Sequence, residues 1–172
     1  RAHALTTGAD GSIYIAGNTS GDLDGQTSNG DSDAFISKFN PDGTKEWTRL
    51  LGTSGWDDAR ALTTGADGSI YIAGYTFGDL DGQTNSGMTA SGSLNPDAFI
   101  SKFNPDGTKD WTRLLGTSGW VWGYALTTGT DGSIYFAGST SGDLDGQTDS
   151  GYGDDAFISK FNADGTKEWT RL

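Results

Sequence analysis

The sequence predicts an all-β fold, a β-propeller made of three four-stranded antiparallel blades. Three observations predict it. Long segments recur three times, apolar and polar residues alternate with period two within each copy, and glycine-rich turns separate the alternating segments. Only 33% of the 172 residues are hydrophobic and 28 are glycine, so the core is narrow and turns take up much of the chain.

One repeated unit accounts for nearly the whole chain. The segment ALTTGADGSIYIAG stands at residues 4–17, 61–74 and, with two changes, 125–138. The segment DAFISKFN also recurs three times, and WTRL closes each copy. We therefore expect blade 1 at residues 1–50, and blades 2 and 3, each with its inter-blade connection, at 51–114 and 115–172.

Each unit is expected to hold two hairpins. In the first copy, strands at Ala4–Thr7 and Ser12–Gly17 flank the turn GADG, and strands at Asp33–Asn40 and Thr44–Leu50 flank PDG. Glycine supplies the positive φ that such tight turns require, and proline presets the first turn dihedral. Two hairpins in sequence make one four-stranded antiparallel sheet.

Successive sheets must stack, because one sheet of this size cannot bury its own faces. Radial stacking gives a β-propeller, which usually needs about four to eight blades. Three blades are too few, so we expect a larger propeller, completed by further blades of the same chain or by a second copy. The repeats start at Arg1 and stop at Leu172 within a connection, so we expect an excerpt of a longer repetitive protein or a trimmed protomer. A linear solenoid is the competing geometry.

Residues 33–74, DAFISKFNPDGTKEWTRLLGTSGWDDARALTTGADGSIYIAG, resemble the bacterial SBBP-type β-propeller repeat. The shared pattern joins a D-A-F-x-x-K-F strand, a D-G turn, a Trp strand, an L-G-x-x-G connection and a D-G-x-hydrophobic-Y strand. The resemblance covers all three copies and implies the propeller fold. It also implies a bacterial protein at the cell surface or outside the cell, and it names no biochemical role.

Composition narrows the function further. Eleven Lys and Arg against 23 Asp and Glu give a net charge of −12, which speaks against nucleic acid and suits divalent cations or basic partners. The sequence has no apolar run long enough for a membrane span. Cysteine is absent, so disulfides and thiol chemistry are excluded. A secreted protein stiffened by calcium instead of disulfides has such a composition, and we expect an extracellular or cell-surface location.

The two ends of each unit vary differently among the copies. Both tight hairpins lie at one end and are nearly invariant, whereas the long connections lie at the other end and differ in length and chemistry. Binding residues concentrate on such variable loops. The candidate partner-binding residues at this end are His3, Asn18, Trp56, Arg60, Tyr75, Phe77, Trp120, Trp122 and Tyr124. We expect self-association or further blades of the same chain as partners, and a glycan or a surface protein as an alternative.

The loop GDLDGQT is identical in all three copies although its neighbours diverge. Two Asp one residue apart, then Gly and an amide residue, resemble the start of calcium loops of the D-x-D-G kind. The candidate calcium ligands are Asp22, Asp24, Gln26 and Asp33; Asp79, Asp81, Gln83 and Asp97; and Asp143, Asp145, Gln147 and Asp155. The match to an EF-hand is partial, and the alternative is an Asx-turn in which the carboxylates bind loop amides and Gly25 takes positive φ.

Enzymatic activity is not expected. His3 is the only histidine, no nucleophile motif accompanies it, and identical Asp pairs in each copy suit a repeated structural task. Two functions remain: a calcium-stabilised structural or surface-assembly component, and a glycan- or protein-binding module that uses the variable end. The sequence favours the first.

Overall fold

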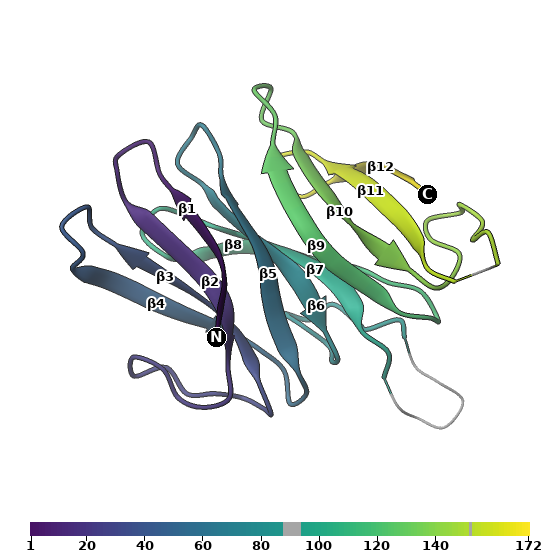
Figure 1. Ribbon diagram of the computed structural model, residues 1–172, viewed down its shortest axis with the longest axis horizontal. Coiled ribbons are helices and arrows are strands. Elements are labelled where there is room, and N and C mark those ends of the chain that lie inside the picture. The colour runs from purple at the N-terminus through teal and green to yellow at the C-terminus, as the bar shows by residue number, and fades with distance from the viewer. Residues whose placement is uncertain (88–93, 152) are drawn as a thin grey trace.

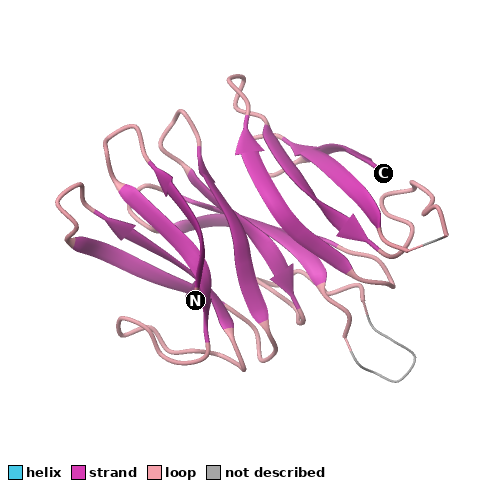
Figure 2. Cartoon of the chain, viewed as in Figure 1, coloured by secondary structure: helices cyan, strands magenta, loops and turns pink. Residues whose placement is uncertain are grey.

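The chain forms three four-stranded antiparallel β-sheets that lie side by side, with the second between the other two (Figure 1). The computed structural model describes residues 1–87, 94–151 and 153–172. Within these residues every regular element is a strand, joined by turns and loops (Figure 2). No helix in this described part is long and apolar enough to cross a membrane.

Each sheet takes its strands in sequence order, as expected for two consecutive hairpins. The first sheet holds β1 (Ala2–Thr7), β2 (Ile13–Thr19), β3 (Asp33–Phe39) and β4 (Lys45–Leu51). The second holds β5 (Asp57–Thr64), β6 (Ile70–Thr76), β7 (Asp97–Phe103) and β8 (Lys109–Leu115). The third holds β9 (Val121–Thr128), β10 (Ile134–Thr140), β11 (Asp155–Phe161) and β12 (Lys167–Arg171).

The tight turns form where glycine was expected to set them. Gly11 and Gly43 adopt φ values of 82° and 84°, in the left-handed region that favours glycine. Between β1 and β2, the Asp10 carboxylate accepts hydrogen bonds from the Ser12 amide at 3.0 Å and the Ser12 hydroxyl at 2.8 Å. These bonds hold the pKa of Asp10 below its usual value, so the ionised carboxylate stabilises the turn.

The core consists of two layers, each between neighbouring sheets. We call the side of a sheet that carries Tyr14, Ile36 and Trp47, or their equivalents, its forward face, and the opposite side its backward face. The forward face of the first sheet packs against the backward face of the second, where Ile72 and Phe99 are fully buried. The second and third sheets repeat this contact through Tyr71, Ile100, Trp111, Ile134, Phe136, Phe157 and Phe161.

A hairpin turn of each following sheet covers the tryptophan of the sheet before it. Trp47 Nε1 donates to Pro105 O at 3.3 Å, and Arg49 Nε donates to Gly107 O at 2.9 Å. A Cβ atom at Gly107 would lie 2.8 Å from the Trp47 ring, so glycine is required there for contact as well as for its φ of 80°. Trp47 thus packs between the first and second sheets.

The second and third sheets reproduce this contact. Trp111 Nε1 donates to Ala163 O at 3.2 Å, and Arg113 Nε donates to Gly165 O at 3.1 Å. The first strand of each sheet lies beside that of the next, since β5 contacts both β1 and β9. The sheets thus converge along their first strands, as the radial geometry predicts and a flat stack of independent sheets does not.

Candidate functional site

The turns and the long connections lie at opposite ends of the sheets. We call the end with the turns β1–β2, β3–β4 and their equivalents the hairpin end. The end with the connections β2–β3, β4–β5 and their equivalents is the loop end. All candidate ligands and partner-binding residues belong to the loop end or to the strand ends beside it.

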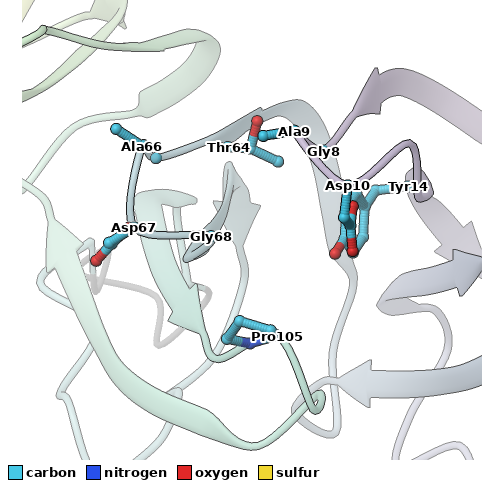
Figure 3. A pocket seen from close by; sticks show the side chains of 10 residues that line it. Gly8, Ala9, Asp10, Tyr14, Thr64, Ala66, Asp67, Gly68 and Pro105 are labelled. Carbon is cyan, nitrogen blue, oxygen red and sulfur yellow. The ribbon is translucent and has the colours of Figure 1, made fainter.

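The hairpin end has one cavity of about 250 Å³ between the first two sheets. Asp10 and Tyr14 lie at one edge of it and Asp67 at the other, with Pro105 from the β7–β8 turn also in its wall (Figure 3). Both carboxylates bind serines of their own turns, Asp10 to Ser12 and Asp67 to Ser69. These charged groups are already used to build turns, so the cavity is a gap between blades and not a candidate site.

The GDLDGQT loop is a compact backbone turn. The Leu23 amide donates to Gln26 O at 3.0 Å and the Gln26 amide donates to Leu23 O at 2.9 Å. Asp24 and Gly25 between them adopt positive φ of 51° and 74°. The other two copies form the same pair of hydrogen bonds and the same φ values within a degree or two. The expected positive φ at Gly25 is confirmed.

The two carboxylates of the loop turn to different partners. Asp22 accepts a hydrogen bond from the Ser28 amide at 2.9 Å, which closes the loop. Asp24 instead binds outside the loop, in an ion pair with Lys45 and a hydrogen bond from the Thr48 hydroxyl on β4. Lys45 first, and then Thr48, holds the pKa of Asp24 below its usual value. The alternative in which Asp24 binds a loop amide is wrong for this residue, because its side chain reaches Lys45 and Thr48 on β4.

The aspartate that opens the third strand of each sheet lies apart from the loop carboxylates. Asp33 is fully buried and accepts from the Asn29 amide at 2.9 Å, while its second oxygen has no hydrogen-bond partner. Asp97 is buried in the same way, and burial raises its pKa to about 6. Asp155 accepts from both the amide and the hydroxyl of Ser150.

The candidate calcium ligands therefore have protein partners of their own. In residues 1–87, 94–151 and 153–172, no three Asp, Glu, His or Cys side chains gather closely enough to hold a metal ion. Gln26, Gln83 and Gln147 take part in the turn through their backbone. Calcium at these positions stays a prediction. The structure gives a second reason why the GDLDGQT sequence is identical in the three copies: in each copy the second Asp of the loop pairs with a lysine on the fourth strand of its own sheet.

A further buried carboxylate was missed by the sequence reasoning. Asp57 at the start of β5 is fully buried, and one of its oxygens accepts from the Thr53 amide at 2.6 Å while the other has no partner. Burial raises the pKa of Asp57, and the charge of nearby Asp33 adds to the shift. The signal was the replacement of Asp57 by Val121 in the next copy, which marks the position as buried.

Three aromatic rings from two sheets meet at the loop end. Tyr75 and Trp122 are 4.4 Å apart between ring centroids, and Phe77 lies 6.1 Å from Tyr75 and 6.0 Å from Trp122, all edge to face. Together with Trp56, Gly55 and Asp31 they line an open cavity of about 460 Å³. We call this cavity the aromatic pocket.

A polar cluster adjoins the pocket through Tyr75. Asp58, which is 2% exposed, forms a 2.8 Å ion pair with Arg60 and accepts from the Tyr75 hydroxyl at 3.2 Å. Its other oxygen lies 3.4 Å from His3 Nε2, close enough for an ion pair when the imidazole is protonated but without hydrogen-bond geometry. Burial raises the pKa of Tyr75, and Asp58 adds to this shift while Arg60 opposes it, so the phenol stays protonated. Asn18 joins the cluster through His3 at 3.2 Å.

The structure thus brings seven of the nine candidate partner-binding residues to one place. They are His3, Asn18, Trp56, Arg60, Tyr75, Phe77 and Trp122. The other two, Trp120 and Tyr124, are 48% and 53% exposed. The backbone pairing is the same in both copies, Phe77 N to Trp56 O and Ser141 N to Trp120 O, each at 3.0 Å. Trp120 does not line the aromatic pocket, and beside it Ser141 stands in the place of Phe77.

The sequence matches a family model described as a β-propeller domain of unknown function, DUF5122, over residues 8–46. This match covers the β1–β2 turn, β2, β3 and the start of β4, and it agrees with the radial arrangement of the sheets. The three sheets are β-propeller blades. We number them 1 to 3 in chain order, and the predicted fold class is confirmed.

Two curated proteins are similar in sequence to the chain. The chain is 33% identical over 168 residues to Regulatory protein FlaEY of Caulobacter vibrioides, which covers 92% of this chain and 18% of that protein. It is also 33% identical over 92 residues to an uncharacterized WD repeat-containing protein of Acanthamoeba polyphaga mimivirus, covering 50% of this chain and 6% of that protein. The chain therefore spans less than a fifth of the length of either relative. A β-propeller repeat protein is supported, and the SBBP type stays a prediction.

Proposed function

We propose that the chain is a non-enzymatic assembly module of the SBBP type, part of an extracellular or cell-surface structural protein, whose end blades pair with further blades. One observation carries the proposal. Equivalent isoleucines on the forward faces differ sharply in exposure: Ile36 is 0% exposed, Ile100 is 1% exposed and Ile158 is 41% exposed. The first two are covered by the next blade, so Ile158 marks a face built to receive one.

The backward face of blade 1 offers the complementary surface. Ile13 and Ile15 are only half-buried, whereas their equivalents Ile70 and Ile72 in blade 2 are fully buried against blade 1. On the same face, Ile15, Leu23, Phe35 and Phe39 help to line an open cavity of about 360 Å³. Blade 3 and blade 1 can therefore repeat, between copies or with added blades, the contact that already joins blades 1 and 2.

The test is the mass of the chain in solution by multi-angle light scattering over a range of concentrations. We expect self-association, abolished by Ile158→Asp and retained in the matched control Trp120→Asp, which alters an exposed aromatic residue of the same blade away from the forward face. A monomeric mass for the unaltered chain at all concentrations would overturn pairing between copies. So would association that survives Ile158→Asp.

Calcium belongs to this proposal as a stabilising ion. The net charge of −12 and the unpartnered buried oxygens of Asp33 and Asp97 support a cation beside the third strand of blades 1 and 2. Asp24 is a weaker candidate because Lys45 already neutralises it. We expect millimolar calcium to raise the unfolding midpoint relative to chelator, and Asp33→Asn to reduce the rise. An unchanged midpoint would remove calcium from the proposal.

A second candidate function is favoured by the aromatic pocket, which joins blades 2 and 3 at the loop end. A cavity walled by aromatic side chains with few polar groups is the usual form of a small-ligand or side-chain site. The chain would then serve as a binding module through its variable end, with a glycan or a surface protein as the expected partner. This function is independent of self-association through Ile158, because Ile158 does not line the aromatic pocket.

A further inference from the structure

We propose that the aromatic pocket binds an organic cation of the quaternary or methylated ammonium class. The inference deepens the binding-module function and rests on it. The pocket is walled by Trp56, Tyr75, Phe77 and Trp122, and its one charged lining residue is Asp31. An alkylated ammonium group suits such a site because its methyl groups are apolar while the group as a whole carries one positive charge.

The rings supply the apolar attraction and the electrostatic attraction together. Trp56 is 43% exposed, and Phe77 and Trp122 are half-buried, so their ring surfaces are accessible from the open side of the cavity. Tyr75 is 7% exposed and holds Trp122 edge to face at 4.4 Å. The negative π face of an aromatic ring attracts a cation within about 6 Å, and tryptophan does so most strongly.

The charges around the pocket favour a cation over an anion. Asp31 is exposed at the rim and has no ion-pair partner among the residues that the structure describes. Asp58 is already neutralised by Arg60 at 2.8 Å. The net charge of −12 draws cations toward the whole molecule and repels carboxylate or phosphate ligands.

The cluster already holds one cation against one of its rings. The Arg60 guanidinium carbon lies 5.4 Å from the Tyr75 ring centroid. Arg60 also reaches the Tyr75 hydroxyl at 3.1 Å, so its position is fixed by Asp58 and Tyr75 together. The aromatic residues of this end therefore tolerate positive charge at close range, with a carboxylate nearby to balance it.

The neighbouring blade shows what the pocket requires. Trp120 of blade 3 occupies the place of Trp56, but Ser139 and Ser141 stand where blade 2 has Tyr75 and Phe77. Trp120 is 48% exposed, close to the 43% of Trp56, so the two copies differ in the rings beside the tryptophan. Blade 2 carries Tyr75 and Phe77 there, which pack with Trp122, and blade 3 carries two serines.

A sugar fits this pocket less well. Sugar hydroxyls need hydrogen-bond partners around the stacked ring, and the polar side-chain groups of the lining are the Asp31 carboxylate, the indole N–H groups of Trp56 and Trp122, and the Tyr75 hydroxyl. That hydroxyl is already engaged by Asp58 and Arg60. An ammonium carrying methyl groups needs no such partners, because its hydrogen-bond donors are replaced by carbon.

The experiment titrates the intact chain with choline and with its neutral isostere, 3,3-dimethylbutanol, by tryptophan fluorescence and calorimetry. We expect choline to bind at least about tenfold more tightly than the neutral compound, since the two differ only in charge. Trp122→Ala should abolish binding and Trp122→Phe should retain part of it, while the matched control Trp120→Ala should bind normally. Asp31→Asn should weaken choline binding several-fold.

Two further ligands, a trimethyllysine peptide and a neutral oligosaccharide, identify the source of the cation and test the binding-module function separately. Tighter binding of a trimethyllysine peptide than of choline would assign the site to a partner protein, and the reverse order to a free ammonium compound. Equal binding of choline and its neutral isostere would overturn the cation inference. A neutral oligosaccharide that binds in place of choline and depends on Trp122 would also overturn it, yet keep the binding module. If neither the cations nor the oligosaccharide binds, the binding module fails as well.

Discussion

The hairpin end and the loop end of the blades derive from the same three copies, yet they differ in how much they have diverged. The β3–β4 turn and its equivalents read NPDG, NPDG and NADG at one end, whereas Tyr75 and Phe77 at the other end become Ser139 and Ser141 one blade later. The difference follows from contact. The β7–β8 and β11–β12 turns each accept a hydrogen bond from the tryptophan side chain of the preceding blade. At the loop end, bonds such as Asp57 N to Ser32 O at 2.7 Å and Val121 N to Pro96 O at 2.8 Å join neighbouring blades through the backbone, which places little demand on side chains.

The two ends also differ in their aspartates. At the hairpin end, hydrogen bonds from turn serines lower the pKa of Asp10 and Asp131. At the loop end, burial raises the pKa of Asp57 and Asp97, although Asp24 is held below its usual pKa by Lys45 and Thr48. At neutral pH the ionised form of Asp57 and Asp97 therefore destabilises the fold, whereas that of Asp10 and Asp131 stabilises it.

The largest effect should come from the contact between blades. Ile100→Ala should lower the free energy of unfolding by about 2–4 kcal/mol, because it opens a cavity between blades 2 and 3. Ile158→Ala, at the equivalent position of blade 3, should cost under about 1 kcal/mol, because Ile158 is 41% exposed. Urea unfolding of both variants measures the difference. Equal losses would mean that packing between blades does not hold the chain together.

A pH profile sharpens the contrast between the ends. The pKa of Asp97 is about 6 in the folded protein against 3.8 for an ordinary Asp, so the folded state binds the proton more tightly. The resulting stabilisation is complete below the unfolded pKa and is lost as pH rises through the folded pKa, a change of up to about 3 kcal/mol. Asp97→Asn should therefore stabilise the chain above the folded pKa and not below the unfolded one.

The matched hairpin-end variant should behave in the reverse sense. Hydrogen bonds from Ser69 lower the pKa of Asp67 in spite of partial burial, so its stabilising effect is present above the unfolded pKa and is lost on acidification. Asp67→Asn should therefore destabilise the chain at neutral pH. Thermal midpoints across the acid range compare the two variants. Parallel profiles would show that the ends do not differ in this way.

The smallest effect is expected at the repeated loop. Asp24→Asn removes the ion pair with Lys45 but keeps a residue that tolerates the positive φ of 51°. Both partners are partly exposed and solvent screens their charges, so the loss should be the smallest of those considered when no calcium is added. Asp24→Ala should cost more, since alanine lacks that tolerance. A loss of several kcal/mol in Asp24→Asn, seen only when calcium is present, would instead favour an ion at this loop.

The sequence was sufficient for the repeats, turns and strands, because these depend on local residues. Predicted strands agree with β2, β3 and β4 within a residue or two, and Gly11 and Gly43 adopt the expected φ. Contacts between residues far apart in the sequence could not be predicted in this way. Lys45, the partner of Asp24, lies 21 residues away, and nothing local indicates that pairing.

The aromatic pocket was predicted only as a set of residues. Tyr75 and Trp122 come from different blades, and their contact depends on how β6 and β9 pack side by side. Variation among the copies indicated the right end of the molecule. It could not separate Trp122, which joins the cluster, from Trp120, which remains exposed two residues earlier.

A hairpin turn of each following blade covers the tryptophan of the blade before it, and two equivalent glycines allow this contact to be tested. Gly43 and Gly107 occupy the same turn position with φ of 84° and 80°. A Cβ atom at Gly107 would lie 2.8 Å from the Trp47 ring, whereas Gly43 has nothing within 4 Å. Alanine should cost about 1–2 kcal/mol at Gly43 from backbone strain alone, and about 1–3 kcal/mol more at Gly107 from the forced contact. Equal losses in urea unfolding would contradict the account.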